Sequence, residues 1–176
     1  MNKVLPHYKY EDRLMWKDSW ELIEGLPYSI RPSSDPAHQL AGASIRTAFV
    51  IALRDSGCKN YQAYNPIDYK INEVTIVIPD ILIVYGKLKK EYLDFAPALI
   101  VEILSLSTAL KDRHTMYELY QQQKVKYYII ADPAKKTLEV FELKGKVYKP
   151  VTSASSYFFD LGDNCTIKPD LSNVFN

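Results

Sequence analysis

Two apolar stretches, each interrupted by one acid, decide the fold: Val74 to Gly86 reads VTIVIPDILIVYG, and Ala98 to Leu104 reads ALIVEIL. Asp80 interrupts the first stretch and Glu102 the second. The second stretch is a continuous apolar run bounded by turn signals, which is typical of a central strand buried on both faces. A buried carboxylate without compensation is costly, so such residues are normally paired, protonated or bound to a metal.

The segments around these two strands predict alternating helices and strands. Asp35 can cap a helix that begins with Pro36, runs from His38 to Arg54 and ends at Gly57. Ser105 to Thr108 can cap a second helix that ends near Gln123. Before the first helix, the sequence predicts a short helix over Asp12–Lys17 and a hairpin WELIEG–LPYSIRP that turns at Glu24–Gly25. After it come one strand, YQAYNPIDYKI, and a turn at Asn72–Glu73. The last three predicted strands are KYYIIAD, TLEVFEL and KVYKPV.

This order predicts an α/β fold with a central mixed sheet flanked by helices. The chain has 176 residues, 47% of them hydrophobic and 24% charged, which fits a single globular domain over residues 1–176. The N-terminal sequence has no apolar signal region, and no apolar run is long enough to cross a bilayer. We therefore expect a cytoplasmic protein without a membrane partner.

The two cysteines and the net charge exclude little. Cys58 and Cys165 are far apart in sequence and form no C-x-x-C pair, so reduced thiols are favoured, with a disulfide left open. The net charge of +1 argues against a histone-like nucleic-acid binder. Between Gly86 and Pro150 basic residues outnumber acids by 12 to 8, a mild bias compatible with a surface that faces phosphates.

Asp80 and Glu102 together suggest metal chemistry. Two carboxylates on adjacent strands can hold one hard divalent cation, with water and phosphate oxygens completing its shell. Such a cation polarises a phosphodiester and activates water. The structural alternatives remain open: Asp80, next to Pro79, can face solvent on an edge strand, and Glu102 can pair with a lysine such as Lys111 or Lys126.

The ordered motifs resemble a known family. WELIEG, PSSDPAHQL, the IPD strand, APALIVEILSLST, the helix KDRHTMYELYQQQ and VKYYIIADP extend from about Trp20 to Tyr148. This pattern resembles the Uma-type family of bacterial restriction endonucleases, which belongs to the PD-(D/E)XK nuclease superfamily. The resemblance implies a restriction-endonuclease-like fold and a Mg²⁺- or Mn²⁺-dependent endonuclease that hydrolyses phosphodiester bonds in DNA.

The resemblance also implies roles for single residues. Asp80 and Glu102 would be the metal-binding acids, and the backbone carbonyl of Ile103 would be a further ligand. The superfamily lysine, two positions after the glutamate, is Leu104 here. In the Uma-type pattern D-R-x-x-K-x-x-x-Y the lysine lies on the next helix, and this chain has Met116 at that position.

Met116 can provide neither a charge nor a proton donor, whereas the lysine would stabilise developing negative charge. Arg113, about 60° from Met116 around an α-helix, is the nearest substitute, since Lys111 lies on the far side. The same pattern makes Asp112 and Tyr120 candidates for substrate or outer-sphere contacts, together with His38 and Glu21 from earlier motifs. For His38 the alternative is a neutral histidine hydrogen-bonded near the helix start, and for Asp112 a helix-capping acid.

Three functions follow from these residues. The first is a DNA endonuclease weakened or inactivated by Met116, the second a nuclease-fold module that binds DNA or metal without turnover, and the third a protein-interaction scaffold. A homodimer is expected, because cutting both strands suits a two-fold arrangement.

Overall fold

The computed structural model describes residues 5–30, 35–105, 108–152 and 157–176. The chain divides into two compact units, each built from separate parts of the sequence. Unit 1 consists of Met1–Pro32, Ile67–Pro79 and Leu88–Phe95, and unit 2 of Ser33–Pro66, Asp80–Lys87 and Ala96–Asn176. The expected single domain stays a prediction.

Unit 1 contains a five-stranded mixed sheet in the order β2-β1-β5-β4-β7. Its elements are α1 (Tyr10–Arg13), β1 (Trp20–Ile23), β2 (Leu26–Ser29), β4 (Asp68–Asn72), β5 (Thr75–Val77) and β7 (Tyr92–Leu93). The predicted hairpin is confirmed: β1 pairs antiparallel with β2 across Glu24 and Gly25. Both turn residues have positive φ, and a Cβ on Gly25 would lie 2.5 Å from the His7 ring, so only glycine fits there.

Unit 2 contains a six-stranded sheet in the order β11-β10-β9-β8-β6-β3. Its strands are β3 (Tyr61–Tyr64), β6 (Ile81–Tyr85), β8 (Leu99–Ile103), β9 (Tyr127–Asp132), β10 (Thr137–Lys144) and β11 (Val147–Pro150). Strands β8 and β9 are parallel, and the other neighbouring pairs are antiparallel. All five residues of β8 and all six of β9 are buried, which confirms the central strand predicted from ALIVEIL.

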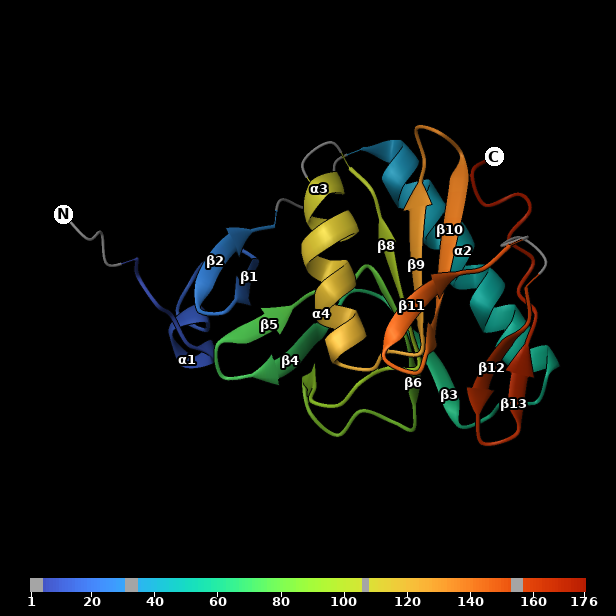
Figure 1. The fold of residues 1–176 in the computed structure, drawn as a ribbon, viewed down its shortest axis with the longest axis horizontal. Coiled ribbons are helices and arrows are strands. Elements are labelled where there is room, and N and C mark those ends of the chain that lie inside the picture. The colour runs from blue at the N-terminus through green and yellow to red at the C-terminus, as the bar shows by residue number, and fades with distance from the viewer. Residues whose placement is uncertain (1–4, 31–34, 106–107, 153–156) are drawn as a thin grey trace. The chain divides into compact units, whose positions relative to one another are not determined.

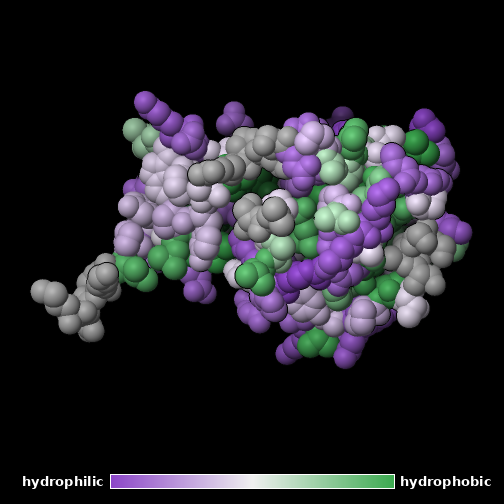
Figure 2. Space-filling model, turned by 90° about the horizontal axis from the view of Figure 1, so that it is seen from above, coloured by the Kyte–Doolittle hydropathy of each residue, from purple (hydrophilic) through white to green (hydrophobic). Residues whose placement is uncertain are grey.

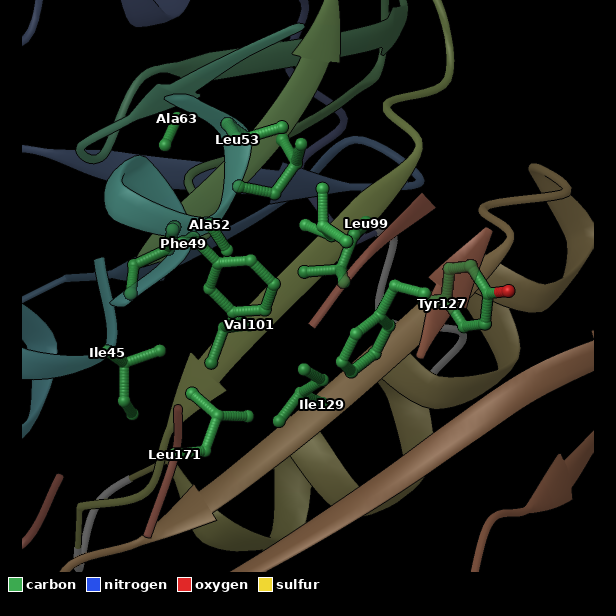
Figure 3. Packing of buried hydrophobic residues seen from close by; sticks show 14 of the residues in the cluster. Ile45, Phe49, Ala52, Leu53, Ala63, Leu99, Val101, Tyr127, Ile129 and Leu171 are labelled. Atoms are coloured by element: carbon green, nitrogen blue, oxygen red, sulfur yellow. The ribbon is translucent and has the colours of Figure 1, made fainter. Parts of the chain in front are cut away.

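Helix α2 (Pro36–Asp55) packs on one face of this sheet. The predicted start is confirmed, because the Asp35 side chain accepts a hydrogen bond of 3.0 Å from the Ala37 N–H and Pro36 takes the first helical position. The helix ends at Asp55, and its C-cap Ser56 is followed by Gly57 in the left-handed conformation that glycine tolerates. Its core contacts include Ile45, Phe49, Ala52, Leu53, Leu99, Val101, Tyr127 and Ile129 (Figure 3).

A second helical segment, between β8 and β9, covers the opposite face (Figure 1). It consists of α3 (Ala109–Lys111), the π-helical turn η1 (Asp112–Met116) and α4 (Tyr117–Gln122). The predicted helix is therefore confirmed in extent but contains a π-turn that the sequence did not suggest. The Thr108 hydroxyl accepts a hydrogen bond from the Ser105 N–H. Residues 106 and 107 of the predicted cap lie outside the described residues, as do residues 32–34 of PSSDPAHQL.

The prediction of a mixed α/β fold is confirmed, but the single central sheet is wrong. The two stretches predicted as one strand each are divided between sheets: YQAYNPIDYKI forms β3 and β4, and VTIVIPDILIVYG forms β5 and β6. Each break contains a proline, Pro66 or Pro79, which has no N–H for a ladder hydrogen bond. The short helix was also misplaced, since α1 covers Tyr10–Arg13 rather than Asp12–Lys17.

The favoured state of the cysteines is corrected as well. Cys58 and Cys165 form a disulfide, with their Cα atoms 5.5 Å apart. Cys165 begins β13 (Cys165–Ile167), which pairs with β12 (Phe159–Gly162) in a hairpin that the sequence analysis did not predict. The hairpin packs on the α2 side through Phe159, whose ring contacts Phe49 and Tyr127. Long-range packing, which sequence spacing does not reveal, brings the two cysteines together.

The surface mixes both kinds of residue: Figure 2 shows one face on which hydrophilic residues are interspersed with hydrophobic ones. Among the described residues, no helix is both long and apolar enough to cross a membrane.

Candidate functional site

Asp80 and Glu102 meet at one end of strands β6 and β8. Ile81 pairs with Val101 in the antiparallel register, and continuing that register by one residue places Asp80 opposite Glu102. Directly opposed residues of antiparallel strands project from the same face. The Asp80 N–H points to Glu102 Oε2 at 3.4 Å, a long contact that confirms the proximity of the two residues. The fold thus brings together the two acids that the sequence singled out.

Backbone and tyrosine hydrogen bonds orient both carboxylates. The Ile103 N–H donates to Asp80 Oδ2 at 2.8 Å, so Asp80 is attached to β8 rather than turned to solvent as an edge residue. The Tyr120 hydroxyl donates to Glu102 Oε1 at 2.6 Å, and both side chains are buried. Lys126, one partner considered for Glu102, instead forms an ion pair of 3.0 Å with Asp160. These contacts explain how acids are accommodated in apolar strands.

His38 connects helix α2 to this strand end. Its Nε2 atom lies 3.4 Å from Asp80 Oδ2. The hydrogen bond to the Asp80 side chain raises the pKa of His38, burial opposes this effect, and a hydrogen bond to the Ile103 backbone raises the pKa further. The contact with Asp80 therefore shifts His38 towards its protonated form relative to a histidine in water, and the neutral state considered from the sequence stays an alternative. His38 contacts the same carboxylate that would bind a metal.

Asp112, Met116 and Tyr120 form a buried row on the helix that covers Glu102. Met116 and Tyr120 have no exposed surface, and Asp112 is 2% exposed. Side chains four residues apart on an α-helix do not point in quite the same direction, and the wider π-turn from Asp112 to Met116 reduces this difference. Since Tyr120 reaches Glu102, Met116 lies on the same buried face, one turn before it. The position of the family lysine thus faces the sheet.

Arg113 is directed to the neighbouring strands. Its guanidinium lies 2.6 Å from Glu139 on β10 and 4.0 Å from Asp132 at the end of β9. The hydrogen bond to Glu139 raises the pKa of Arg113. Its charge is therefore engaged by carboxylates other than Asp80 and Glu102.

Glu21 belongs to unit 1 and is 2% exposed. Its Oε1 atom accepts a hydrogen bond of 2.9 Å from the N–H of Ile78, which also belongs to unit 1. A contact of Glu21 with substrate or with the outer sphere of the site stays a prediction.

Sequence reasoning missed two residues near the site. Tyr128 is fully buried, and its hydroxyl donates to the Asp112 carbonyl at 2.9 Å. Burial raises the pKa of Tyr128 well above its usual value, and the nearby Glu102 carboxylate adds to this effect. Asp132 ends β9, the parallel neighbour of β8, and is 7% exposed. The signal in the sequence that could have identified Asp132 is an acid at the end of an apolar strand.

The donor set fits a divalent cation. No group of three or more His, Cys, Asp or Glu side chains suited to a metal occurs within the described parts of the chain. Mg²⁺, however, keeps several waters and commonly takes only one or two protein carboxylates. Asp80 Oδ2 is occupied by the Ile103 N–H and His38, whereas no hydrogen bond to Oδ1 occurs within the described residues. Asp80, Glu102 and the Ile103 carbonyl are the hard oxygen donors such an ion prefers.

A mixed sheet between helices, with two acids at one strand end, defines this protein as an α/β protein with a candidate carboxylate site. The family model of Uma2, described as putative restriction endonuclease, matches residues 10–174. The chain therefore belongs to the Uma2 family. A search of curated proteins gave no match.

Solved structures support the fold. The crystal structure of a putative nuclease belonging to DUF820 from Anabaena variabilis matches with a TM-score of 0.72 at 13% sequence identity. The match covers 95% of this chain and 97% of the other. At this identity the similarity concerns the fold.

Proposed function

We propose that the chain is a Mg²⁺- or Mn²⁺-dependent DNA endonuclease of low intrinsic rate, with Asp80 and Glu102 as its metal-binding acids. The observation that carries the proposal is the placement of these two carboxylates at one strand end, each oriented by hydrogen bonds. Family membership supports a nucleic-acid substrate. A bound divalent cation supplies Lewis-acid polarisation of a phosphodiester and lowers the pKa of water.

The chain's own residues hold this site in place. The Ile103 N–H and His38 keep Asp80 in one orientation, and Tyr120 does the same for Glu102. Orienting groups of this kind raise the affinity of carboxylates for a metal and fix its geometry. Burial on the β8 side keeps bulk water away from Glu102.

Met116 limits the rate in this proposal. A missing charge-stabilising donor typically costs about 10²–10³ in rate. Met116 lies on the buried face that also carries Tyr120, so a lysine side chain there would extend along the side of the helix that meets Glu102. Methionine preserves the packing while leaving the site without this ammonium group.

The test compares Mg²⁺-dependent nicking of plasmid DNA by the wild type, Met116→Lys and Met116→Gln. Lysine should raise the rate, whereas glutamine, of similar length but without charge, should not. Asp80→Asn in the lysine background should abolish the gain. Equal rates for the lysine and glutamine variants, both shown to be folded by circular dichroism, would refute the role of Met116.

Arg113 is the proposed weak substitute for the lysine. Because Glu139 engages its guanidinium, Glu139→Gln should release Arg113 and increase residual cleavage, and Arg113→Gln should remove that increase. No response to either change would exclude Arg113 from the reaction.

The second candidate is a DNA-binding module without turnover, which the buried Met116 at the position of the family lysine favours over an active enzyme. It predicts DNA binding without cleavage even in Met116→Lys. The expected homodimer and cytoplasmic location stay predictions.

A further inference from the structure

Arg46 on helix α2 differs from the other described arginines. Its Nε atom is buried and has no hydrogen-bond partner among the described residues. Arg13 is paired with Asp68, Arg54 with Asp55 and Arg113 with Glu139. Arg46 itself is only partly buried, so part of its side chain reaches the surface. A guanidinium has five donors and strongly favours an anionic partner.

Helix geometry places Arg46 in the same row as the site histidine. His38, Gly42 and Arg46 follow one another at intervals of four residues and therefore lie along one side of α2. Two members of the row have known contacts. His38 contacts Asp80, and a Cβ on Gly42 would lie 3.1 Å from Cδ1 of Ile103. The row thus begins at the proposed metal site.

The length of this row suits a nucleic-acid strand. Eight residues of helix separate His38 from Arg46, which corresponds to about 12 Å along the axis. Along the axis of a duplex one strand advances about 3.4 Å per phosphate, so a row of this length parallel to that axis would span about three to four phosphates. A strand whose phosphate lies at Asp80 can therefore present a flanking phosphate to Arg46.

We propose that Arg46 binds a non-bridging phosphate oxygen of the DNA backbone a few nucleotides from the cleaved bond. The inference rests on the proposed function and adds a substrate-positioning residue to it. The phosphate supplies an acceptor for a guanidinium whose buried Nε atom has no partner among the described residues. Phosphate contacts of this kind set the register of a protein on DNA without reading its sequence.

The test is DNA binding without catalysis. Fluorescence anisotropy of a short fluorescein-labelled duplex, in EDTA and at several salt concentrations, compares the wild type with Arg46→Met and Arg54→Met. Arg54 is the matched control because it lies on the same helix, is exposed and is paired with Asp55. Arg46→Met should weaken binding about 10- to 100-fold and reduce the salt slope by about 1, while Arg54→Met should stay close to the wild type.

Further measurements separate effects of the substitutions on folding from their effects on DNA binding. Arg46→Met keeps an apolar stem, so urea unfolding should show unchanged or increased stability. If this variant does not fold, Arg46→Lys takes its place: it should keep the salt slope and bind more weakly, because lysine lacks the bidentate fork. Inorganic phosphate alone should produce no thermal shift that depends on Arg46, which separates a free oxyanion from the DNA backbone.

Equal DNA affinities for folded wild type and Arg46 variants would overturn this inference and leave the proposed nuclease intact. An Arg46-dependent shift with inorganic phosphate alone would overturn the assignment to DNA. A wild type without any affinity for DNA would overturn both this inference and the proposed function.

Discussion

At the scale of single residues, the site depends on how each buried carboxylate is compensated. Glu102 is 6% exposed and accepts a hydrogen bond from Tyr120, and Asp80 accepts one from a backbone N–H. Hydrogen bonds to charged groups contribute more to stability than neutral ones, and an unsatisfied buried acceptor is expensive. The acids and their donors therefore stabilise the fold as a unit, before any ligand is considered.

Tyr120→Phe should lower the free energy of unfolding by about 1.5–3 kcal/mol, since it removes the hydroxyl that donates to Glu102. Tyr28→Phe, at a tyrosine 40% exposed, is the control and should change stability by less than about 0.5 kcal/mol. Urea denaturation measures both. Equal effects of the two changes would show that the Tyr120 hydroxyl contributes nothing at Glu102.

His38 gives the site a dependence on pH in protein freed of divalent ions by EDTA. Its pKa is raised in the folded state, chiefly by the hydrogen bond to Asp80. The resulting stabilisation is complete below the ordinary histidine pKa and is lost as the pH rises through the raised value. As the pH rises from the ordinary histidine pKa through the raised value, the difference in free energy of unfolding between the wild type and Asp80→Asn should therefore decrease. NMR titration of His38 should show a lower pKa in Asp80→Asn; an unchanged value would exclude the contact.

At the scale of elements, the sequence predicts helix starts and buried strands well because their signals are local. The Asp35–Pro36 start, the hairpin turn at Glu24–Gly25 and the buried run in β8 all follow from neighbouring residues. The strand breaks have a local signal in Pro66 and Pro79, but the sheet that each half joins depends on long-range packing, as does the π-turn. The same reason explains why Asp80 and Glu102 were found but the Tyr120–Glu102 hydrogen bond was not.

The close approach of α2 to β8 can be measured at Gly42. An alanine there should gain helix propensity, about 1 kcal/mol, but its Cβ would lie 3.1 Å from Cδ1 of Ile103. Ile103→Val removes that methyl group. Gly42→Ala should therefore be more stabilising in the Ile103→Val background than in the wild type, by at least about 0.5 kcal/mol in a double-mutant cycle followed by urea denaturation. Strict additivity would contradict this contact.

At the scale of the whole molecule, the chain is stabilised by contacts that join distant parts of the sequence. In unit 2 the Cys58–Cys165 disulfide spans 107 residues and connects the segment after α2 to the β13 strand. The Tyr61 hydroxyl reinforces the same region by donating to the Leu161 carbonyl at 2.6 Å. Neither contact has a signal in the local sequence.

Loss of the disulfide should lower stability by about 2–4 kcal/mol, since a cross-link over a long loop restricts the unfolded chain. Dithiothreitol should lower the melting temperature of the wild type but leave that of Cys58→Ser/Cys165→Ser unchanged. The double variant should remain folded because the Tyr61 and Phe159 contacts persist. A wild-type melting temperature insensitive to reduction would contradict a stabilising disulfide.

The central claim is that Asp80 and Glu102 bind one divalent ion, and Mn²⁺ titration followed by isothermal calorimetry tests it most directly. The wild type should bind a single Mn²⁺ and melt at a higher temperature in its presence, because an ion that binds only the folded state stabilises it. Asp80→Asn and Glu102→Gln should each abolish both effects, while Asp163→Asn, an exposed control, should preserve them. Undiminished Mn²⁺ binding in the two site variants, or no binding by the wild type, would contradict the account.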